Sequence, residues 1–167
     1  LNSYYLQGGY FAENTSVKLI AFAGKEKTYH AWGYATKEQM EKFGRRYNPC
    51  GEMYTDANGK KYYYDDQTDN YLQKNYQLLF NHTFSTAWNL NVALHYTKGD
   101  GYYEEYKDGR YLIEYGLKSF TIDGTEVSKS DLVRQKKMDN KFGGGVFSLN
   151  YTANRLSASL GGGLNQY

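Results

Sequence analysis

Hydrophobic and polar residues alternate along several stretches of about 10 residues in this chain. The clearest stretch lies at residues 75–84. Its mostly apolar positions are Tyr76, Leu78, Phe80, His82 and Phe84, and its mostly polar positions are Asn75, Gln77, Leu79, Asn81 and Thr83. Because successive side chains of a strand point to opposite faces, this pattern predicts a β-strand with one apolar and one polar face.

The same alternation recurs on either side of three short predicted turns, at residues 12–15, 85–87 and 152–154. After the second turn the apolar positions are Leu90, Val92, Leu94 and Tyr96, and after the third they are Leu156, Ala158, Leu160, Gly162 and Leu164. The first pair of strands is less regular, because Ile20 and Phe22 fall on its otherwise polar face. The pattern predicts three antiparallel hairpins, at about residues 1–24, 75–98 and 138–167.

Two long segments, at about residues 25–74 and 99–137, separate the predicted hairpins. Residues 36–43 are expected to form a short helix, since Thr36 can cap it and Gln39 completes a capping box. Residues 54–64 are expected to form a small hairpin, and Asp-Gly turns are expected at residues 108–109 and 123–124. Long loops with elements of their own are typical of ordered, functional segments.

Composition supports an all-β fold and excludes several classes of protein. The 167 residues include 20 Tyr, 18 Gly and only one Pro, and tyrosine favours strands. The longest clean apolar stretch, residues 19–23, is far shorter than the roughly 18 residues of a transmembrane helix. A net charge of +2 is too balanced to predict a nucleic-acid surface.

Alternation alone fits a soluble β-sandwich and a membrane β-barrel about equally well. Three further features favour the barrel: the polar face is rich in Asn, Gln, Ser and Thr, the long loops share one side, and aromatic residues lie beside the short turns. These aromatic residues are Tyr10, Phe11, Phe84, Trp88 and Tyr151. We therefore predict a segment of an antiparallel transmembrane β-barrel, with about six strands, periplasmic short turns and long extracellular loops. Leu78, Leu94 and Leu160 are expected to face lipid.

Both chain ends have strand-like sequences, so we expect the chain to be part of a longer polypeptide. A six-stranded piece is below the roughly eight strands of the smallest membrane barrels, so we do not expect it to close alone.

The reactive side chains do not form a recognisable catalytic or metal-binding pattern. Cys50 is the only cysteine, and it is either a partly buried thiol or a partner for a cysteine elsewhere in a longer protein. The three histidines lack nucleophile or ligand partners at suitable spacing, so we expect no enzymatic activity, no metal site and no cofactor. The run at residues 65–70 is rich in oxygen ligands, but it lacks the Gly and Glu of a calcium loop and is interpreted as solvated. The glycine runs at residues 143–145 and 161–163 are expected to bend strands rather than bind phosphate.

Two aromatic runs in the long loops, at residues 30–34 and 102–106, are the candidate ligand-binding segments. We expect them to contact a ligand by stacking and hydrogen bonding. The candidate residues are Trp32, Tyr34, Tyr102, Tyr103 and Tyr106. Packing of one loop against another is an equally good interpretation of these aromatic residues.

The residues of the second hairpin resemble a known family. Residues 75–84, 88–91 and 95–103 look like the barrel of TonB-dependent outer-membrane receptors from Bacteroidetes. Residues 46–51 and 137–140 are similar to loop and strand-entry segments of the same group. The resemblance spans most of the chain, but it does not specify a substrate.

The resemblance implies a large plugged barrel, commonly of about 22 strands, in the bacterial outer membrane. Such a barrel imports a scarce nutrient with energy from the TonB complex, and the nutrient could be a siderophore, haem, cobalamin or a glycan. The implied partners are the remainder of the barrel with its plug domain, the TonB complex through an N-terminal region, a surface lipoprotein and outer-membrane lipid. Neither the plug nor the TonB-contacting region is found in these 167 residues. The alternatives are a soluble carbohydrate-binding β-sandwich, a passive porin and a surface adhesin.

Overall fold

The computed structural model describes residues 1–167, and 68% of them form strands while 7% are helical. The fold is mostly antiparallel β, as the sequence predicts. The elements in chain order are β1 (Asn2–Phe11), β2 (Thr15–Tyr29), α1 (Lys37–Phe43), β3 (Glu52–Thr55), β4 (Lys61–Tyr63), β5 (Thr68–Thr83), β6 (Trp88–Tyr111), the 3-10 helix η1 (Leu112–Tyr115), β7 (Phe120–Ile122), β8 (Thr125–Val127), β9 (Lys129–Ala153) and β10 (Leu156–Gln166). The chain divides into two compact units, which are described separately.

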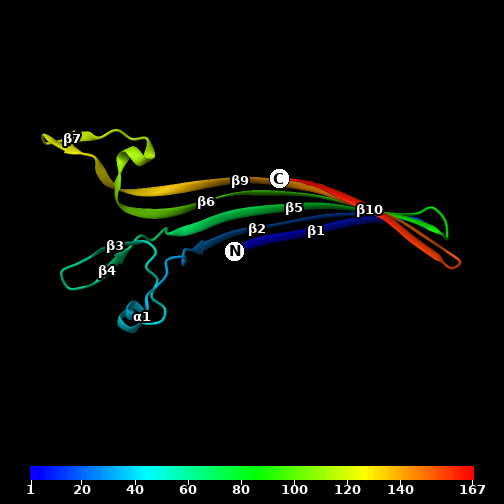
Figure 1. Ribbon diagram of the computed structural model, residues 1–167, viewed down its shortest axis with the longest axis horizontal. Coiled ribbons are helices and arrows are strands. Elements are labelled where there is room, and N and C mark those ends of the chain that lie inside the picture. Colours follow the sequence, from blue (N-terminus) through cyan, green and yellow to red (C-terminus); the bar gives the residue numbers. More distant parts are fainter. The chain divides into compact units, whose positions relative to one another are not determined.

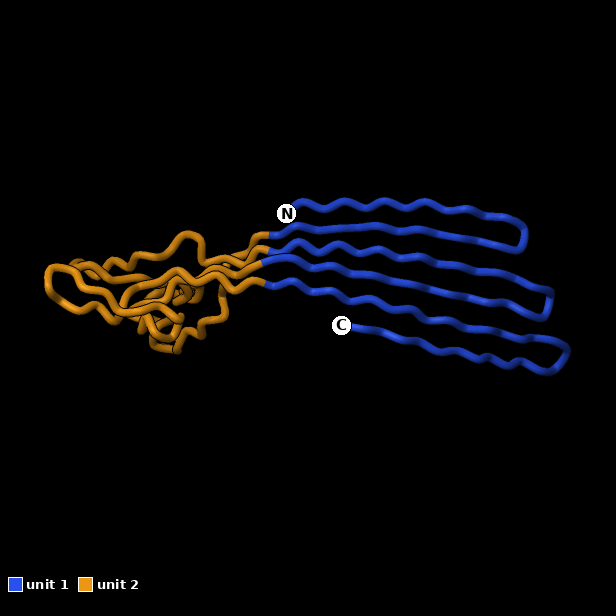
Figure 2. Tube along the Cα trace, turned by 90° about the horizontal axis from the view of Figure 1, so that it is seen from above, with its two compact units in different colours: residues 1–26, 71–101, 138–167 blue, residues 27–70, 102–137 orange.

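Unit 1 consists of residues 1–26, 71–101 and 138–167. Its strands belong to a six-stranded sheet in the order β1-β2-β5-β6-β9-β10, so each strand lies beside its neighbour among the long strands of the chain. The three short turns of unit 1 lie at one end of its strands (Figure 2). This up-and-down arrangement follows from the tight turns, because a connection of two to four residues brings the next strand back beside the previous one.

The strand register in unit 1 separates an apolar face from a polar face. Leu6 lies opposite Ala21 in the first hairpin, and Leu160 lies opposite Leu149 in the last. In the middle of the sheet, Tyr76 of β5 stacks with Tyr96 of β6, with ring centroids 6.5 Å apart. Alternation along each strand places the predicted apolar positions on this one face, which we call the apolar face.

Hydrogen-bonded amides and hydroxyls follow the opposite, polar face. The Asn81 side chain donates to Asn91 at 2.5 Å, and Asn91 donates to Ser148 on the next strand at 3.2 Å. The exception predicted from the sequence is also present, since Phe22 stacks with Tyr5 on this face, with ring centroids 6.4 Å apart. The polar face is therefore wettable but interrupted by aromatic rings near the chain start.

The described residues bury very little apolar surface. Ala23 and Leu112 are the only buried hydrophobic residues, and no side chain is less than 2% exposed. Large apolar side chains of the sheet stay open, for example Leu160 at 65% exposure. A sheet with one open apolar face cannot derive its stability from its own core, so another molecule or another part of a protein must shield this face from water.

Unit 2 consists of residues 27–70 and 102–137. The predicted helix is confirmed as α1, and its capping box is formed by Thr36 and Gln39. The predicted small hairpin is confirmed as β3–β4, and the turn at residues 123–124 joins β7 to β8. Figure 1 draws α1 as a coiled ribbon and labels the short strands β3, β4 and β7. No helix of the structure is long and apolar enough to cross a membrane.

Two expectations about the strands differ from the structure. The edge strands β1 and β10 have the expected length, with 10 and 11 residues, but the four inner strands are longer, and β6 and β9 reach 24 and 25 residues. The predicted turn at Asp108–Gly109 is wrong, because β6 continues through it to Tyr111. Gly109 has a φ of 50°, and its amide donates to Asp131 at 2.9 Å, so this glycine provides a local irregularity within a strand rather than a chain reversal.

Candidate ligand-binding surface

The five candidate residues belong to unit 2 and come from two segments. Trp32 and Tyr34 follow the end of β2, whereas Tyr102, Tyr103 and Tyr106 lie on β6. Because strand side chains alternate, Tyr103 points to the opposite side of β6 from Tyr102 and Tyr106. The structure therefore places three of the candidates in two separate clusters.

The first cluster is formed by three aromatic rings. His30 stacks on Trp32 with ring centroids 3.7 Å apart, and Tyr103 meets both rings edge-on, at 5.8 Å from His30 and 5.4 Å from Trp32. The Lys136 ammonium lies 5.8 Å from the Tyr103 ring centroid. Trp32 is 50% exposed, so one part of its ring is held by neighbours while another part is open to a ligand. We call His30, Trp32 and Tyr103 the aromatic platform.

The sequence did not identify His30 as part of this platform. The residue is only 3% exposed, and neither of its ring nitrogens has a hydrogen-bond partner. Burial lowers the pKa of the His30 imidazole, although the carboxylates of Asp69 and Glu105 act in the opposite direction. The ring is therefore neutral at pH 7 and serves as a flat packing surface for Trp32.

The backbone around His30 is fixed by polar contacts. Its amide donates to the Gln67 carbonyl at 3.0 Å, and its own carbonyl accepts from the Asn48 side chain at 2.6 Å. Nearby, the Gly33 amide donates to the Cys50 sulfur at 3.1 Å, and Cys50 is a free, half-buried thiol. A Cβ on Gly33 would lie 3.0 Å from that sulfur, so only glycine fits this close approach of the two loop segments.

A buried carboxylate lies on the same side of β6 as Tyr103. Glu105 is 4% exposed and is bound by two cations, Arg134, whose Nε donates at 2.8 Å, and Lys107 at 2.8 Å. Burial alone would raise the pKa of the Glu105 carboxyl, but the hydrogen bonds and charges of Lys107 and Arg134 outweigh it and lower the pKa. The pair with Arg134 joins β6 to β9 and stiffens the strand that carries Tyr103.

The second cluster contains Tyr106. Its hydroxyl donates to Asp131 at 2.7 Å, and this bond raises the pKa of Tyr106 to about 12. The Tyr64 ring lies 6.5 Å away and donates its hydroxyl to Glu104, which raises the pKa of Tyr64 to about 12. The hydroxyls of both tyrosines are thus already engaged, and this cluster resembles the loop packing that was the alternative interpretation.

Two candidates join neither cluster within unit 2. Tyr34 is 97% exposed, and Tyr102 is partly exposed and forms no ring pair there. The residues that the sequence reasoning missed are His30, Tyr64 and Lys136. His30 had a signal, because it lies two residues before Trp32 within the same aromatic run.

The platform can bind a flat or ring-shaped ligand by stacking on Trp32, with the Lys136 ammonium and the Tyr103 hydroxyl nearby as polar contacts. No group of three or more His, Cys, Asp or Glu side chains in the structure is arranged to hold a metal ion. Comparisons with protein-family models, with curated proteins and with solved structures found no significant match to this chain.

Proposed function

We propose that the chain is part of the wall of an outer-membrane β-barrel that imports a nutrient in a TonB-dependent manner. The observation that carries the proposal is the apolar face of unit 1, whose large side chains lie open in the structure. Lipid can cover such a face. When the edges of an antiparallel sheet close into a barrel, every backbone N–H and C=O group in the lipid is hydrogen-bonded within the sheet.

Aromatic side chains lie at both ends of the apolar face, as they do in membrane barrels. Near the short turns, Trp88 of β6 contacts Tyr151 of β9, with ring centroids 4.8 Å apart. At the other end, Tyr96 stacks with Tyr76. Trp88 and Tyr96 are eight positions apart on β6, which corresponds to about 27 Å along an extended strand. With a tilt of about 40°, this length spans roughly 21 Å of depth, close to the apolar band of about 25 Å.

The opposite face supports a water-filled interior. Its Asn81, Asn91 and Ser148 side chains form a chain of hydrogen bonds across three strands. A soluble sandwich would instead need a second sheet against the apolar face, whereas the two other sheets here are two-stranded ribbons in unit 2.

The open edges of the sheet support the need for further strands. β1 and β10 are the two edge strands, and each presents a row of unpaired backbone groups. In the proposed assembly these edges pair with the remainder of the barrel, which encloses a plug domain. The proposed further partners are the TonB complex and a surface lipoprotein.

The aromatic platform is the proposed nutrient contact, and unit 2 is proposed to be extracellular. A half-exposed tryptophan held by two rings loses little freedom when a ligand stacks on it, which favours binding. Siderophores, haem, cobalamin and glycans all offer a ring to stack.

Uptake by intact cells tests this function. Cells that express the complete polypeptide containing residues 1–167 are compared with deletion cells, with ferric siderophore, haem, cobalamin or a glycan as the limiting nutrient. Growth on one of these nutrients that depends on the protein, together with short-term uptake of that nutrient that a protonophore abolishes, supports active import. Protonophore-insensitive uptake would point to a passive porin, and a protein that is monomeric in water without detergent would point to the soluble sandwich.

The platform is tested with the nutrient that this assay identifies. We expect Trp32→Ala combined with Tyr103→Ala to weaken binding about tenfold, since the loss of stacking costs about 0.5–1.5 kcal/mol per aromatic contact. Tyr34→Ala is the matched control, because Tyr34 is 97% exposed and outside the platform. Equal affinity of the double variant and the wild type would refute the role of the platform.

A further inference from the structure

Two lysines lie side by side on the apolar face of unit 1, just beyond the tyrosine pair. Tyr76 and Tyr96 stack across β5 and β6. Because the strands are antiparallel, Lys74 and Lys98 are the next residues on the same face and lie opposite each other. Like charges directly opposite in a sheet are destabilising unless an anion lies between them.

A third lysine extends this row to β9. A Cβ built on Gly143 would lie 3.3 Å from Tyr96 Cδ2, so Gly143 is the neighbour of Tyr96 on the apolar face. Two residues along the same strand, Lys141 is therefore the neighbour of Lys98. With strands about 4.8 Å apart, the row Lys74, Lys98 and Lys141 spans roughly 10 Å. We call these three residues the lysine row.

Acidic residues near the row neutralise only part of its charge. Lys98 forms an ion pair with Asp100 at 3.2 Å, and both side chains are partly exposed. Asp139 lies on the same face as Lys141 but two residues farther from the tyrosine pair. No ion pair within unit 1 involves Lys74 or Lys141. The lysine row therefore keeps a net positive charge, and this charge lies next to the apolar part of the same face.

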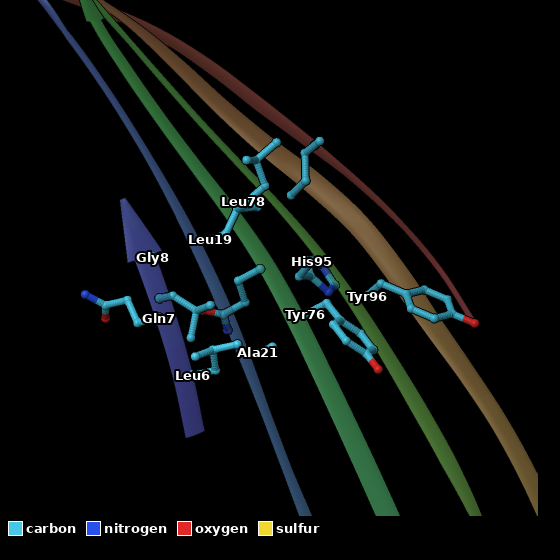
Figure 3. Close-up of a pocket in the computed structure, with 12 residues that line it drawn as sticks. Leu6, Gln7, Gly8, Leu19, Ala21, Tyr76, Leu78, His95 and Tyr96 are labelled. Carbon is cyan, nitrogen blue, oxygen red and sulfur yellow. The ribbon is translucent and has the colours of Figure 1, made fainter. Parts of the chain in front are cut away.

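An apolar groove lies on the same face next to Lys74 and Lys98, and the tyrosine pair forms part of its wall. Its volume is about 600 Å³, and its walls include Leu6, Leu19, Leu78 and the rings of Tyr76 and Tyr96 (Figure 3). Small residues widen it, and a Cβ added to Gly8 in its lining would meet no atom within 4 Å. An apolar channel beside a row of cations is complementary to a molecule with an aliphatic chain and an anionic head.

We propose that this surface binds an anionic lipid whose phosphate contacts the lysine row and whose acyl chain fills the groove. The lysine stems can lie along apolar surface while their ammonium groups reach the level of the phosphates. The inference rests on the proposed function, because it requires the apolar face of unit 1 to be in a membrane. It goes further in assigning one lipid class to one place on that face.

The test measures lipid binding to the complete polypeptide in neutral detergent by native mass spectrometry. The probes are dioleoylphosphatidylglycerol, which is anionic, and dioleoylphosphatidylcholine, which has the same chains and no net charge. A lysine near an anionic lipid contributes roughly a fivefold preference. Since Asp100 offsets part of the charge, we expect the wild type to prefer the anionic lipid about tenfold or more.

Three variants distinguish binding of the lipid headgroup from binding of its acyl chains. The triple variant Lys74→Gln, Lys98→Gln, Lys141→Gln should lose the preference, and the same triple change to Arg should keep it. Lys18→Gln is the matched control, because Lys18 alternates with Val17 and Leu19 and therefore lies on the polar face. Gly8→Leu should fill the groove and weaken both lipids by the same factor, leaving the preference intact.

The outcomes decide between this inference and the proposed function. If the wild type binds both lipids equally, or if the triple Gln variant keeps the preference, the lysine row is not a lipid site, while the membrane function stands. If neither lipid binds and the protein is stable without detergent, the proposed function itself fails. If the triple Gln variant does not fold, 0.5 M NaCl on the wild type replaces it, and a preference unaffected by salt overturns the inference.

Discussion

Placing arginine at three positions of β10 tests whether the apolar face of unit 1 contacts lipid. Leu156 and Leu160 lie on the apolar face of the same strand, and they are similarly exposed, at 61% and 65%. Ser159 is adjacent to Leu160 but faces the polar side, where its hydroxyl donates to Asn150 at 2.8 Å. The substitutions Leu156→Arg, Ser159→Arg and Leu160→Arg thus vary depth and face separately on one strand.

The expected magnitudes follow from the position of each residue along the strand. Leu156 is the first residue of β10 after the turn, at the level of the expected interface. Leu160 is four positions further, about 13 Å along the strand and roughly 10 Å deeper at a tilt of about 40°. Arginine facing lipid costs about 2–4 kcal/mol near the bilayer centre and about 0–1 kcal/mol near the interface. We therefore expect Leu160→Arg to lower the free energy of unfolding by about 3 kcal/mol, and the other two by less than about 1 kcal/mol.

The measurement is reversible denaturant unfolding of the complete polypeptide in lipid vesicles, followed by tryptophan fluorescence. A difference of about 2 kcal/mol between Leu160→Arg and Leu156→Arg is a factor of roughly 30 in the unfolding equilibrium constant and is easily resolved. If the apolar face were covered by a protein sheet, the two leucine positions would not differ by depth. If this face were in water, all three substitutions would have effects near zero, and either result would refute the assignment to lipid.

Three further predictions concern unit 2. Since burial lowers the pKa of His30, the folded state loses stability as the pH falls below about 6.5. The variant His30→Phe keeps the stacking on Trp32, and we expect it to remove this loss of stability when unfolding is measured at several pH values. An unchanged pH profile would contradict the assignment. The pKa of Tyr64 is raised to about 12 by its hydrogen bond to Glu104, so Glu104→Gln should move the ultraviolet titration of Tyr64 towards 10 and reduce the loss of stability between pH 10 and 12. Thr36→Ala removes the cap of α1 and should destabilise the helix by about 1 kcal/mol, which hydrogen exchange of the Gln39 amide would detect as faster exchange, whereas Thr36→Ser should preserve it.

The faces of the sheet could be predicted from the sequence because the side-chain period of a strand is two. Once Leu78 and Leu94 were assigned to one face by alternation, the short turn between their strands left little freedom in the pairing. The structure places both residues in the lining of the same groove. The same local logic found α1, because the Thr36 cap and Gln39 are three residues apart and need no distant partner.

The aromatic platform could be predicted only in part, because its contacts join segments far apart in the chain. Trp32 and Tyr103 were both candidates, but nothing in the sequence shows that their rings meet across 71 positions with His30 between them. Alternation could have separated Tyr103 from Tyr102 and Tyr106, since adjacent residues of a strand point to opposite sides. That step required the knowledge that β6 extends through residues 102–106, where the expected end of the strand was near residue 98.

The glycines of the last hairpin make contacts that the sequence did not predict. Residues 143–145 and 161–163 do lie within β9 and β10, but their lack of side chains also makes room for large neighbours. A Cβ on Gly145 would lie 2.6 Å from Leu94 Cδ2, and one on Gly162 would lie 3.1 Å from the Phe147 ring. The side chains of Leu94 and Phe147 thus occupy the space that a Cβ would need at these two glycines. A glycine beside a large apolar residue lets the neighbouring side chain take its place, so these runs allow close packing between strands in addition to any strand curvature.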